Sequence, residues 1–556
     1  MDLKELLVES LPQEIKQHKD LLAPCADKKM GDYTIPCFAL AKEQHKSPIA
    51  IAEQLAQGLQ TNQMIASAQA VNGYLNLFLN KKFVAQQVGL QFEKLGTNMF
   101  KLSKGQGKTV CIDYSSANLA KYLHIGHLST TILGECIARL YQNSGYKVVR
   151  INFVGDSGTP FGKIISAYKL WGKKEDVDAR GVDALQDLYI EFSKHEGEEK
   201  FDDMARECFK KIEQKDPETI NLYNWFYKIC LDYNKKATRE LGAVFDDCTG
   251  ESYYLKDMPK IEKMLEDKGL LHIGEGGAKI VDLGKQLGIA VIVKSNGSSL
   301  YITRDIAAAM DRYQKYHFDK NLYVTDVAQK LHFEQVFKIL ELLGCDYAKN
   351  CEHIYYGRIR LPEGKISSRL GKQALIRDIL DEAIKKAKET IKDRNLPNAD
   401  EVASVVGKGA TFFTVTKNEK IKDTVFDMNE ALKFEGDTSP YMQYTYARCA
   451  SILRKANANF DNIDFQYLAT EDAFEVVKMI GNFANTIDIA TQKQEPNIVN
   501  RAVMALCTAV NKFYTTQRVI TQDKQETNAK AFLIFMAKET IKFGLNLICI
   551  DTVESM

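Results

Sequence analysis

Residues 113–135, DYSSANLAKYLHIGHLSTTILGE, decide how the centre of the chain folds. The β-branched run TVCIDYSS predicts a strand at the start of this stretch, and the residues after His124 and His127 have the pattern of a helix. KVVRINFVGD, at 147–156, predicts the next strand. Strand, helix and strand make the βαβ unit of a parallel sheet, which binds ligands at the carboxyl ends of its strands. The sequence therefore predicts an α/β fold with its site at this junction.

The composition is that of an ordinary globular protein. The chain has 556 residues, enough for roughly three to four domains. Its 45% hydrophobic and 26% charged residues exclude the disordered and collagen-like classes. Lys and Arg number 74 against 73 Asp and Glu, so a nucleic-acid partner would have to meet a local basic patch.

Cysteine usage and hydropathy indicate the compartment. The twelve cysteines are scattered without a CxxC pair, which predicts buried or idle thiols in a reducing setting. The N-terminus lacks the apolar run of a signal peptide, and no stretch approaches the roughly 20 apolar residues of a membrane span. We therefore expect a soluble, cytoplasmic protein with no membrane partner.

The first predicted domain covers residues 1–105. An amphipathic helix from Leu3 opens it, a second helix follows at 50–59, and the alternating run at 69–79 predicts a strand broken by Gly73. The Gly- and Lys-rich segment KLSKGQGK predicts a linker to the next domain.

The second predicted domain, 106–375, is the α/β unit, and the third, 376–556, is almost wholly helical. Charged helical sequence at about 163–250 predicts an insertion into the sheet. The runs KIVDLG, GIAVIVK, LYITRD and NLYVTDVA, within 279–328, predict the strands that complete the sheet, and a helix is expected at 332–343.

The HIGH junction suits nucleotide phosphate. A helix that begins after a strand presents unpaired N–H groups and a positive dipole end. Gly126 has no Cβ, so a base or ribose could approach the backbone, and His124 and His127 could donate hydrogen bonds to phosphate oxygens. Taken alone, an HxxH pair is as often an incidental part of a surface or core as it is a functional site. We expect no metal site, because neither a neighbouring Cys nor an HExxH glutamate is present.

A second motif changes the balance. GRIRLPEGKISSRLGK, at 357–372, is a cationic, hydroxyl-rich loop whose Lys365, Ser367, Ser368 and Arg369 could cradle a triphosphate and neutralise leaving pyrophosphate. Alone it would predict only a solvated turn. HIGH followed by a KMSKS-like loop is the paired signature of class I aminoacyl-tRNA synthetases.

In detail the chain resembles the arginyl-tRNA synthetases over nearly its whole length. Four blocks carry the resemblance: DYSSANLAKYLHIGHL; VGDSGTPFG; SLYITRDIAA with TDVAQKLHFEQVF; and GDTSPYMQYTYARCASILRK. It implies a Rossmann-like class I catalytic domain with an N-terminal α+β domain that contacts tRNA and an all-α, DALR-type anticodon-binding domain. The implied reaction is ATP-dependent activation of L-arginine and transfer to tRNA(Arg), with Mg²⁺ accompanying ATP.

The resemblance implies an arginine pocket whose residue types make chemical sense. A guanidinium is a planar fork of donors best met by a carboxylate with aromatic or amide neighbours. Asp305 is the natural partner, with Tyr301 beside it, although without the family these two would predict an N-cap and a core tyrosine. The expected arginine-binding residues are Asp113, Ser116, Ala117, Asn118, His127, Glu251, Tyr301, Asp305 and Gln329.

The resemblance also assigns the ATP site and the catalytic groups. This sequence departs from the family in two ways: Ala117 stands where many members have Pro, and Ser368 replaces the second lysine of the motif. In one branch a lysine before HIGH supplies the missing charge, and Lys121 occupies that position. The expected ATP-binding residues are His124, Gly126, His127, Lys365, Ser367 and Ser368, and the expected catalytic residues are Lys121, His124, His127, Lys365 and Arg369.

The flanking domains are expected to bind tRNA. Stacking of Tyr74 on an unpaired base would be sequence-tolerant, and residues 425–439 match a tRNA-contacting loop of the family. The expected tRNA-binding residues are Asn72, Tyr74, Asn76, Tyr441, Tyr444, Tyr514 and Met556.

Three alternatives stay open, and the chain is expected to be a monomer. One is an inactive or regulatory tRNA-binding relative, against which His124, His127, Tyr301 and Asp305 all argue. Another is a different class I synthetase, such as a cysteinyl enzyme, whose zinc-ligand cysteines are not evident. A nucleotidylyltransferase would leave the helical C-terminal third without a purpose.

Overall fold

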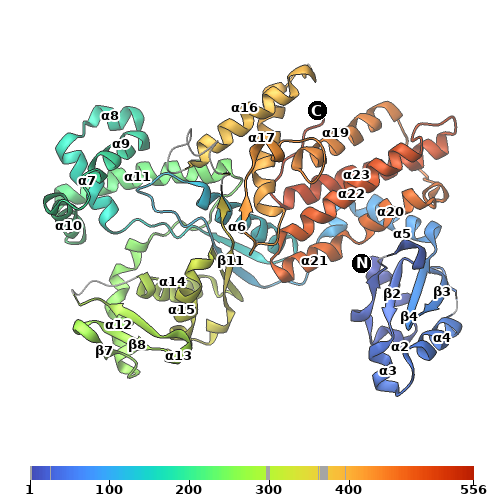
Figure 1. Cartoon of the computed structure of the whole chain (residues 1–556), viewed down its shortest axis with the longest axis horizontal. Helices are drawn as coiled ribbons and strands as arrows, with labels where there is room; N and C mark the ends of the chain where they lie inside the picture. The colour runs from blue at the N-terminus through green and yellow to red at the C-terminus, as the bar shows by residue number, and fades with distance from the viewer. Residues whose placement is uncertain are drawn as a thin grey trace.

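The computed structural model describes residues 3–25, 27–59, 61–295, 301–360, 362, 374–394 and 396–556. An N-terminal α+β unit lies beside the C-terminal helices, and the α/β unit occupies the centre and opposite end of the molecule (Figure 1). The long α6 (Ile125–Asn143) runs between the central sheet and the C-terminal helices.

The N-terminal unit is a four-stranded antiparallel sheet, in the order β1-β2-β4-β3, covered by short helices. The run expected as one strand broken at Gly73 is instead a hairpin. Asn72 and Gly73 have φ of 50° and 82°, and two successive residues in the left-handed region are what a two-residue hairpin turn requires. The elements are α1 (Leu3–Ser10), α2 (Gln13–Lys16), β1 (Ala23–Pro24), β2 (Tyr33–Pro36), α3 (Phe38–Gln44), α4 (Pro48–Gly58), β3 (Ile65–Val71), β4 (Tyr74–Leu79) and α5 (Lys81–Leu95).

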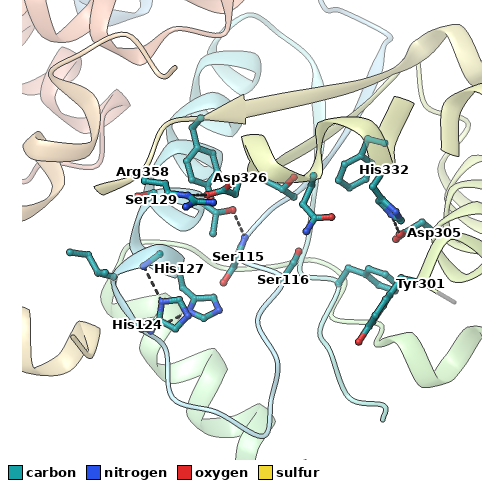
Figure 2. Close-up of a pocket in the computed structure, with 18 of the residues that line it drawn as sticks. Ser115, Ser116, His124, His127, Ser129, Tyr301, Asp305, Asp326, His332 and Arg358 are labelled. Carbon is teal, nitrogen blue, oxygen red and sulfur yellow. Dashed lines mark hydrogen bonds and ion pairs between the residues drawn. The ribbon is translucent and has the colours of Figure 1, made fainter. Parts of the chain in front are cut away.

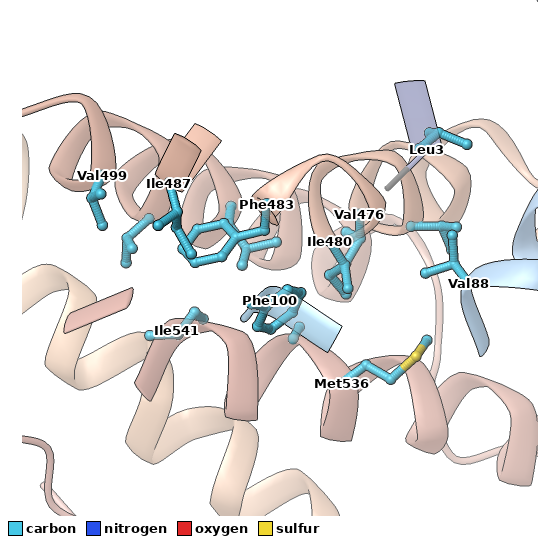
Figure 3. Close-up of a cluster of buried hydrophobic side chains, with 14 of the residues drawn as sticks. Leu3, Val88, Phe100, Val476, Ile480, Phe483, Ile487, Val499, Met536 and Ile541 are labelled. Carbon is cyan, nitrogen blue, oxygen red and sulfur yellow. The ribbon is translucent and has the colours of Figure 1, made fainter. Parts of the chain in front are cut away.

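This unit packs on the C-terminal helices through a shared hydrophobic core. Leu3, Val88 and Ile480 belong to one buried cluster, while Phe100, just before the linker, packs edge-on against Phe483 at 5.2 Å between ring centroids (Figure 3). Polar contacts fix the orientation: Tyr33 donates to Asn482 Oδ1 at 2.7 Å, and Lys478 Nζ lies 2.7 Å from Asp32. The N-terminal unit and the C-terminal helices thus form one packed body.

The central sheet is wholly parallel, in the order β11-β10-β5-β6. Helix α6 connects β5 to β6, which confirms the βαβ unit expected at HIGH. The helix is buried over most of its length because it is covered on both sides. Its one carboxylate, Glu135, is buried and lies 2.8 Å from Arg139 and 3.0 Å from Arg150. The strands are β5 (Thr109–Asp113), β6 (Lys147–Ile151), β10 (Lys320–Asp326) and β11 (Cys351–Tyr356).

A helical insertion follows β6 and packs around its own apolar clusters. Tyr122, just before HIGH, donates to Asp183 of this insertion, and Arg377 donates to the same carboxylate at 2.8 Å. The insertion is therefore anchored beside the site. Its helices are α7 (Thr159–Trp171), α8 (Lys174–Arg180), α9 (Val182–Ser193), α10 (Glu199–Glu213) and α11 (Pro217–Glu240).

The segment after the insertion corrects two expectations. LYITRD was expected to be a strand, but residues from Tyr301 form α14 (Tyr301–Tyr316), because Ile302, Ile306 and Ala309 recur at helical spacing and bury one face. KIVDLG and GIAVIVK are strands, but of a separate three-stranded antiparallel sheet, β7-β8-β9. These elements are α12 (Met258–Asp267), β7 (His272–Ile273), β8 (Lys279–Asp282), α13 (Gly284–Leu287), β9 (Ile289–Val293) and, after β10, α15 (Lys330–Leu342).

In the part of the C-terminal unit that the structure describes, β13 is the only strand. It pairs in parallel with β12 and ties this unit to the chain leaving the central sheet. Within the described ranges, no helix is both long and apolar enough to cross a membrane. The elements are β12 (Ile359–Arg360), α16 (Ile376–Ile391), α17 (Ala399–Thr416), β13 (Thr424–Val425), α18 (Met428–Ala431), α19 (Ser439–Ala456), α20 (Glu471–Gly481), α21 (Phe483–Lys493), α22 (Pro496–Thr516) and α23 (Lys524–Leu547).

Candidate active site

A cavity of about 770 Å³ opens at the carboxyl ends of β5, β10 and β11 (Figure 2). This is the edge at which parallel sheets bind ligands. The HIGH junction forms one side of the cavity, and the starts of α14 and α15 form the other. Of the residues expected from the sequence, the structure brings together Ser116, His124, Gly126, His127, Glu251, Tyr301, Asp305 and Gln329.

The two HIGH imidazoles are oriented by the backbone of the helix start. His124 is the N-cap of α6, and its Nδ1 accepts from the N–H of Gly126 at 3.1 Å. Nδ1 of His127 accepts from the N–H of His124, also at 3.1 Å. A ring nitrogen that accepts carries no proton, so a neutral ring must carry its proton on Nε2. Both rings therefore offer Nε2–H donors.

Both imidazoles are held neutral. Burial lowers the pKa of His127 to about 3, with the neighbouring His124 as a second cause. Burial, helped by the charge of Lys121, also lowers the pKa of His124. Gly126 has a further reason to lack a side chain, since a Cβ there would come within 2.9 Å of the His124 ring. The junction supplies two fixed neutral donors rather than a proton-transfer group.

The loop after β5 is strained and tightly held. Ser115 and Ser116 have φ of 70° and 44°, a region that residues with a Cβ rarely adopt outside constrained sites. Two hydrogen bonds hold this conformation. The N–H of Ser115 donates to Thr130 Oγ1 at 3.1 Å, and the N–H of Ser116 donates to Asn152 Oδ1 at 3.0 Å. Ser116 reaches the cavity as expected because its backbone is bent in this way.

Asp113 does not line the cavity, contrary to expectation. Its Oδ2 accepts from the buried Arg312 at 2.7 Å, and its Oδ1 accepts from the Ser116 hydroxyl at 2.7 Å. The guanidinium of Arg312 is in turn covered by the Phe153 and Tyr323 rings. Both carboxylate oxygens are thus committed beneath the loop, and Asp113 supports Ser116 rather than facing a ligand.

Ala117 and Asn118 also lie outside the cavity. Ala117 is fully buried, and the Asn118 Oδ1 accepts from the N–H of Ala120 at 3.0 Å. Their backbones pair with Gly155, where an added Cβ would lie 3.2 Å from the Asn118 Cα. The VGDSG segment therefore packs directly against the loop that leads into HIGH and supports it.

The other side of the cavity gathers acidic and aromatic groups. Tyr301 and Asp305 lie one helical turn apart at the start of α14, and Gln329 precedes α15. Glu251, before α12, approaches from the insertion side. Burial raises the pKa of Glu251 to about 7, and Arg304 opposes that shift.

Three basic residues that line the cavity, Arg304, His332 and Arg358, were not among those expected from the sequence. Arg304 donates to Glu251, and its guanidinium lies 4.8 Å from the Tyr301 ring centre. His332 lies on α15 with its Nε2 2.6 Å from Asp305 Oδ2. Arg358 pairs with Asp326 at 3.3 Å. No local spacing signals these pairs, because each joins separate elements; only the quoted blocks around Arg304 and His332 marked the neighbourhood.

The second motif reaches HIGH through its far end. The N–H of Ile125 donates to Ala374 O at 2.9 Å, and the N–H of Ile376 donates to Leu123 O at 3.0 Å. The chain that leaves the motif therefore runs antiparallel to the HIGH loop. The residues expected to bind phosphate, Lys365, Ser367, Ser368 and Arg369, lie outside the described residues.

Lys121 is exposed and does not line the cavity. Its Nζ lies 5.7 Å from the centre of the Tyr189 ring of the insertion. Its charge nevertheless reaches the site, because it contributes to lowering the pKa of His124.

The expected tRNA contacts of the N-terminal unit divide into two groups. Asn72 lies in the β3–β4 turn, and Tyr74 is 40% exposed with its ring edge-on to Phe38. Asn76 is only 4% exposed, and its Oδ1 accepts from Thr34 at 2.6 Å. Asn76 therefore joins two strands and is buried, unlike the exposed Asn72 and Tyr74.

Three of the four C-terminal residues expected at tRNA line one groove of about 620 Å³. Tyr441 lies apart, its hydroxyl accepting from Asn511 at 3.0 Å. The groove is basic, as nucleic-acid recognition requires. We call it the α19–α22 groove; its lining includes Tyr444, Arg448, Arg454, Lys455, Tyr514, Arg518 and Met556.

Two solved structures share the fold along almost the whole chain. Thermus thermophilus arginyl-tRNA synthetase matches with a TM-score of 0.84 at 24% identity, covering 100% of both chains. Arginyl-tRNA synthetase from Plasmodium falciparum matches with a TM-score of 0.81 at 21% identity, over 96% and 94% of the two chains. The family model for the catalytic domain of class I (R) tRNA synthetases matches residues 93–428. Fold and cavity together define a class I aminoacyl-tRNA synthetase.

The N-terminal and C-terminal units each match a family model as well. The arginyl-tRNA synthetase N-terminal domain model covers residues 2–79, and the DALR anticodon-binding domain model covers 442–556. Arginine–tRNA ligases of Halothermothrix orenii and Clostridioides difficile are 40% and 39% identical to this chain, covering 100% of it and 100% and 98% of their own lengths. The chain belongs to the arginyl-tRNA synthetase family.

Proposed function

We propose that this chain is an arginine–tRNA ligase whose cavity activates L-arginine with ATP. The observation that carries the proposal is one cavity with fixed imidazole donors on one side and Glu251, Tyr301 and Asp305 on the other. The first side suits phosphate, and the second suits a guanidinium. Few other amino acids would use two carboxylates and an aromatic ring together.

In the first step, an oxygen of the arginine carboxylate attacks the α-phosphorus of ATP and the bond to pyrophosphate breaks. The Nε2–H groups of His124 and His127 would stabilise charge on the phosphate oxygens without transferring a proton. Mg²⁺ is expected as part of the ATP substrate. Positioning and charge stabilisation carry most of such a reaction.

In the second step, a hydroxyl of the terminal adenosine of tRNA(Arg) attacks the arginyl carbonyl and AMP leaves. Its proton departs with the displaced phosphate or with solvent. Contacts with tRNA are proposed at Asn72 and Tyr74, at residues 425–439 and in the α19–α22 groove. The exposed Tyr74 and Tyr514 rings suit base stacking.

Guanidinium recognition supports selectivity without editing. A site with partly buried carboxylates, such as Glu251 and Asp305, discriminates against substrates that leave those groups unpaired. We further propose that the chain works as a cytoplasmic monomer. The alternative, a tRNA-binding relative without catalysis, is disfavoured because the imidazole donors on one side of the cavity and the carboxylates on the other are both present.

The deciding experiment is pyrophosphate exchange with each of the twenty amino acids, with and without tRNA(Arg). Exchange that depends on arginine, and on tRNA as is typical of the family, is expected. Exchange with a different amino acid alone would overturn the substrate assignment. Tight tRNA(Arg) binding without any exchange would favour the inactive relative.

A further inference from the structure

The carboxylate expected to meet the substrate guanidinium is already held by a neighbouring helix. Nε2 of His332 lies 2.6 Å from Oδ2 of Asp305, and the side chains are 24% and 13% exposed. Asp305 comes from α14 and His332 from α15, two helices that pack together. Figure 2 shows the pair facing the cavity beside Tyr301.

The electrostatic surroundings explain why Asp305 needs such a partner. Asp305 adds to the causes that raise the pKa of Glu251, so the two acids repel each other. The nearest cation on the same helix, Arg304, is turned toward Glu251. Among the described residues, His332 is the group that the structure joins to Asp305 by a hydrogen bond.

We propose that His332 is a positioning residue for arginine recognition, an inference that rests on the proposed function. By donating to Oδ2, its Nε2–H fixes the rotation of the Asp305 carboxylate and leaves Oδ1 to accept from the substrate guanidinium. A carboxylate held in place loses less conformational freedom when the substrate binds. His332 therefore sets the affinity for arginine and the preference for a charged guanidinium over a neutral urea.

The geometry of α15 favours this role over simple packing. Gln329, the N-cap residue just before α15, also lines the cavity, so a substrate-facing residue and a positioning residue lie three residues apart at this end of the helix. The His332 ring meets Phe333 edge-on at 5.2 Å. Packing alone would need the ring but not its donor.

The experiment separates the donor from the ring. H332M puts an apolar side chain of similar length in place of the imidazole and removes the donor, whereas H332Q retains a donor. H332A is a second variant without a donor, to be used if H332M fails to fold. K338A, in an exposed ion pair with Glu341 on the same helix, is the control. KM for arginine and for ATP are measured in aminoacylation, together with inhibition by L-citrulline, in which a urea replaces the guanidinium.

We expect H332M to raise the KM for arginine about tenfold while the KM for ATP and the thermal unfolding midpoint stay near those of K338A. H332Q should recover part of the loss. Citrulline should compete better against arginine in H332M than in the wild type. Equal rises in both KM values would overturn the proposal, as would an H332Q variant no better than H332M.

A double-mutant cycle tests whether His332 acts through Asp305. In a D305A background, H332M should have almost no further effect on the KM for arginine, because the group it positions is gone. A full additional effect would overturn the proposal. A wild-type protein without arginine-dependent exchange would defeat the proposed function itself, whereas an active wild type with an unaffected H332M defeats only the inference about His332.

Discussion

The backbone N–H of His124 donates to Nδ1 of His127 at 3.1 Å. This single bond fixes the tautomer of one HIGH histidine through the backbone of the other. A second bond, from the N–H of Gly126, fixes the tautomer of His124 in the same way. The low pKa of His127 has a different origin: burial lowers it, and the neighbouring His124 is the second cause.

Replacement of His127 by Asn should reduce the loss of stability in acid. The pKa of His127 is lowered to about 3 in the fold against about 6.5 when unfolded. Between these values the unfolded chain binds more protons, so the free energy of unfolding falls as pH falls below 6.5. Urea unfolding at pH 7, 6 and 5 should show a shallower fall for H127N than for the wild type.

The matched control is His45→Asn, at an exposed histidine in the left-handed region, where Asn is well tolerated. H45N should follow the wild-type pH dependence. Parallel curves for H127N and H45N would contradict the assignment of a buried neutral His127.

Asp113→Asn should act on stability before it acts on arginine binding. Removing the charge leaves the guanidinium of Arg312, itself 2% exposed, without its ion-pair partner. Breaking a buried pair from one side costs about 3–5 kcal/mol, whereas Asp203→Asn, in an exposed pair with Arg206, should leave the stability almost unchanged. Denaturant unfolding measures both. An unchanged stability with a raised KM for arginine would restore Asp113 as a substrate ligand.

The sequence allowed the βαβ unit to be predicted because its signals are local. Strand, HIGH and helix follow one another within one window, and each has its own period. The segment LYITRD was too short for its alternation to be decisive, and the helical spacing of Ile302, Ile306 and Ala309 becomes visible only over the whole of α14.

The candidate site could be predicted where the family resemblance points to residues, and less so where two distant elements meet. The resemblance indicates Asp305 and Tyr301, and their residue types then fit a guanidinium; on local signals alone they would predict an N-cap and a core tyrosine. Arg304 and His332 acquire their meaning only from partners 53 and 27 residues away. The partner of Asp113 could not be predicted for the same reason, since Arg312 lies on α14, far along the chain, and donates to its carboxylate.

Lys121→Ala should slow adenylate formation far more than it weakens tRNA binding. The lysine is exposed and its ammonium lies over Tyr189, yet its charge is felt at His124. If it supplies the charge that Ser368 lacks, its loss should reduce the exchange rate about tenfold or more, equivalent to ~1.4 kcal/mol of transition-state stabilisation. Pyrophosphate exchange and a tRNA filter-binding assay separate the two effects.

Lys173→Ala is the control for a general loss of positive charge, because Lys173 is an exposed lysine of the helical insertion that follows β6. A K121A variant as active as K173A in exchange would exclude Lys121 from the activation step and leave the serine of the second motif uncompensated.

Tyr514→Ala should weaken tRNA(Arg) binding without changing its dependence on salt. The ring is 43% exposed at the α19–α22 groove, where it could stack on a base. Base stacking contributes about 1–3 kcal/mol, so the Kd should rise roughly five- to hundredfold, and Tyr514→Phe should bind nearly as well as the wild type.

Lys455→Gln, in the same groove, provides the contrast: loss of one phosphate contact should lower the slope of log Kd against log salt by about 1. Because stacking and phosphate neutralisation respond differently to salt, titrations at three ionic strengths separate them. An altered salt slope for Y514A, or binding by Y514A equal to the wild type, would exclude Tyr514 as a stacking surface.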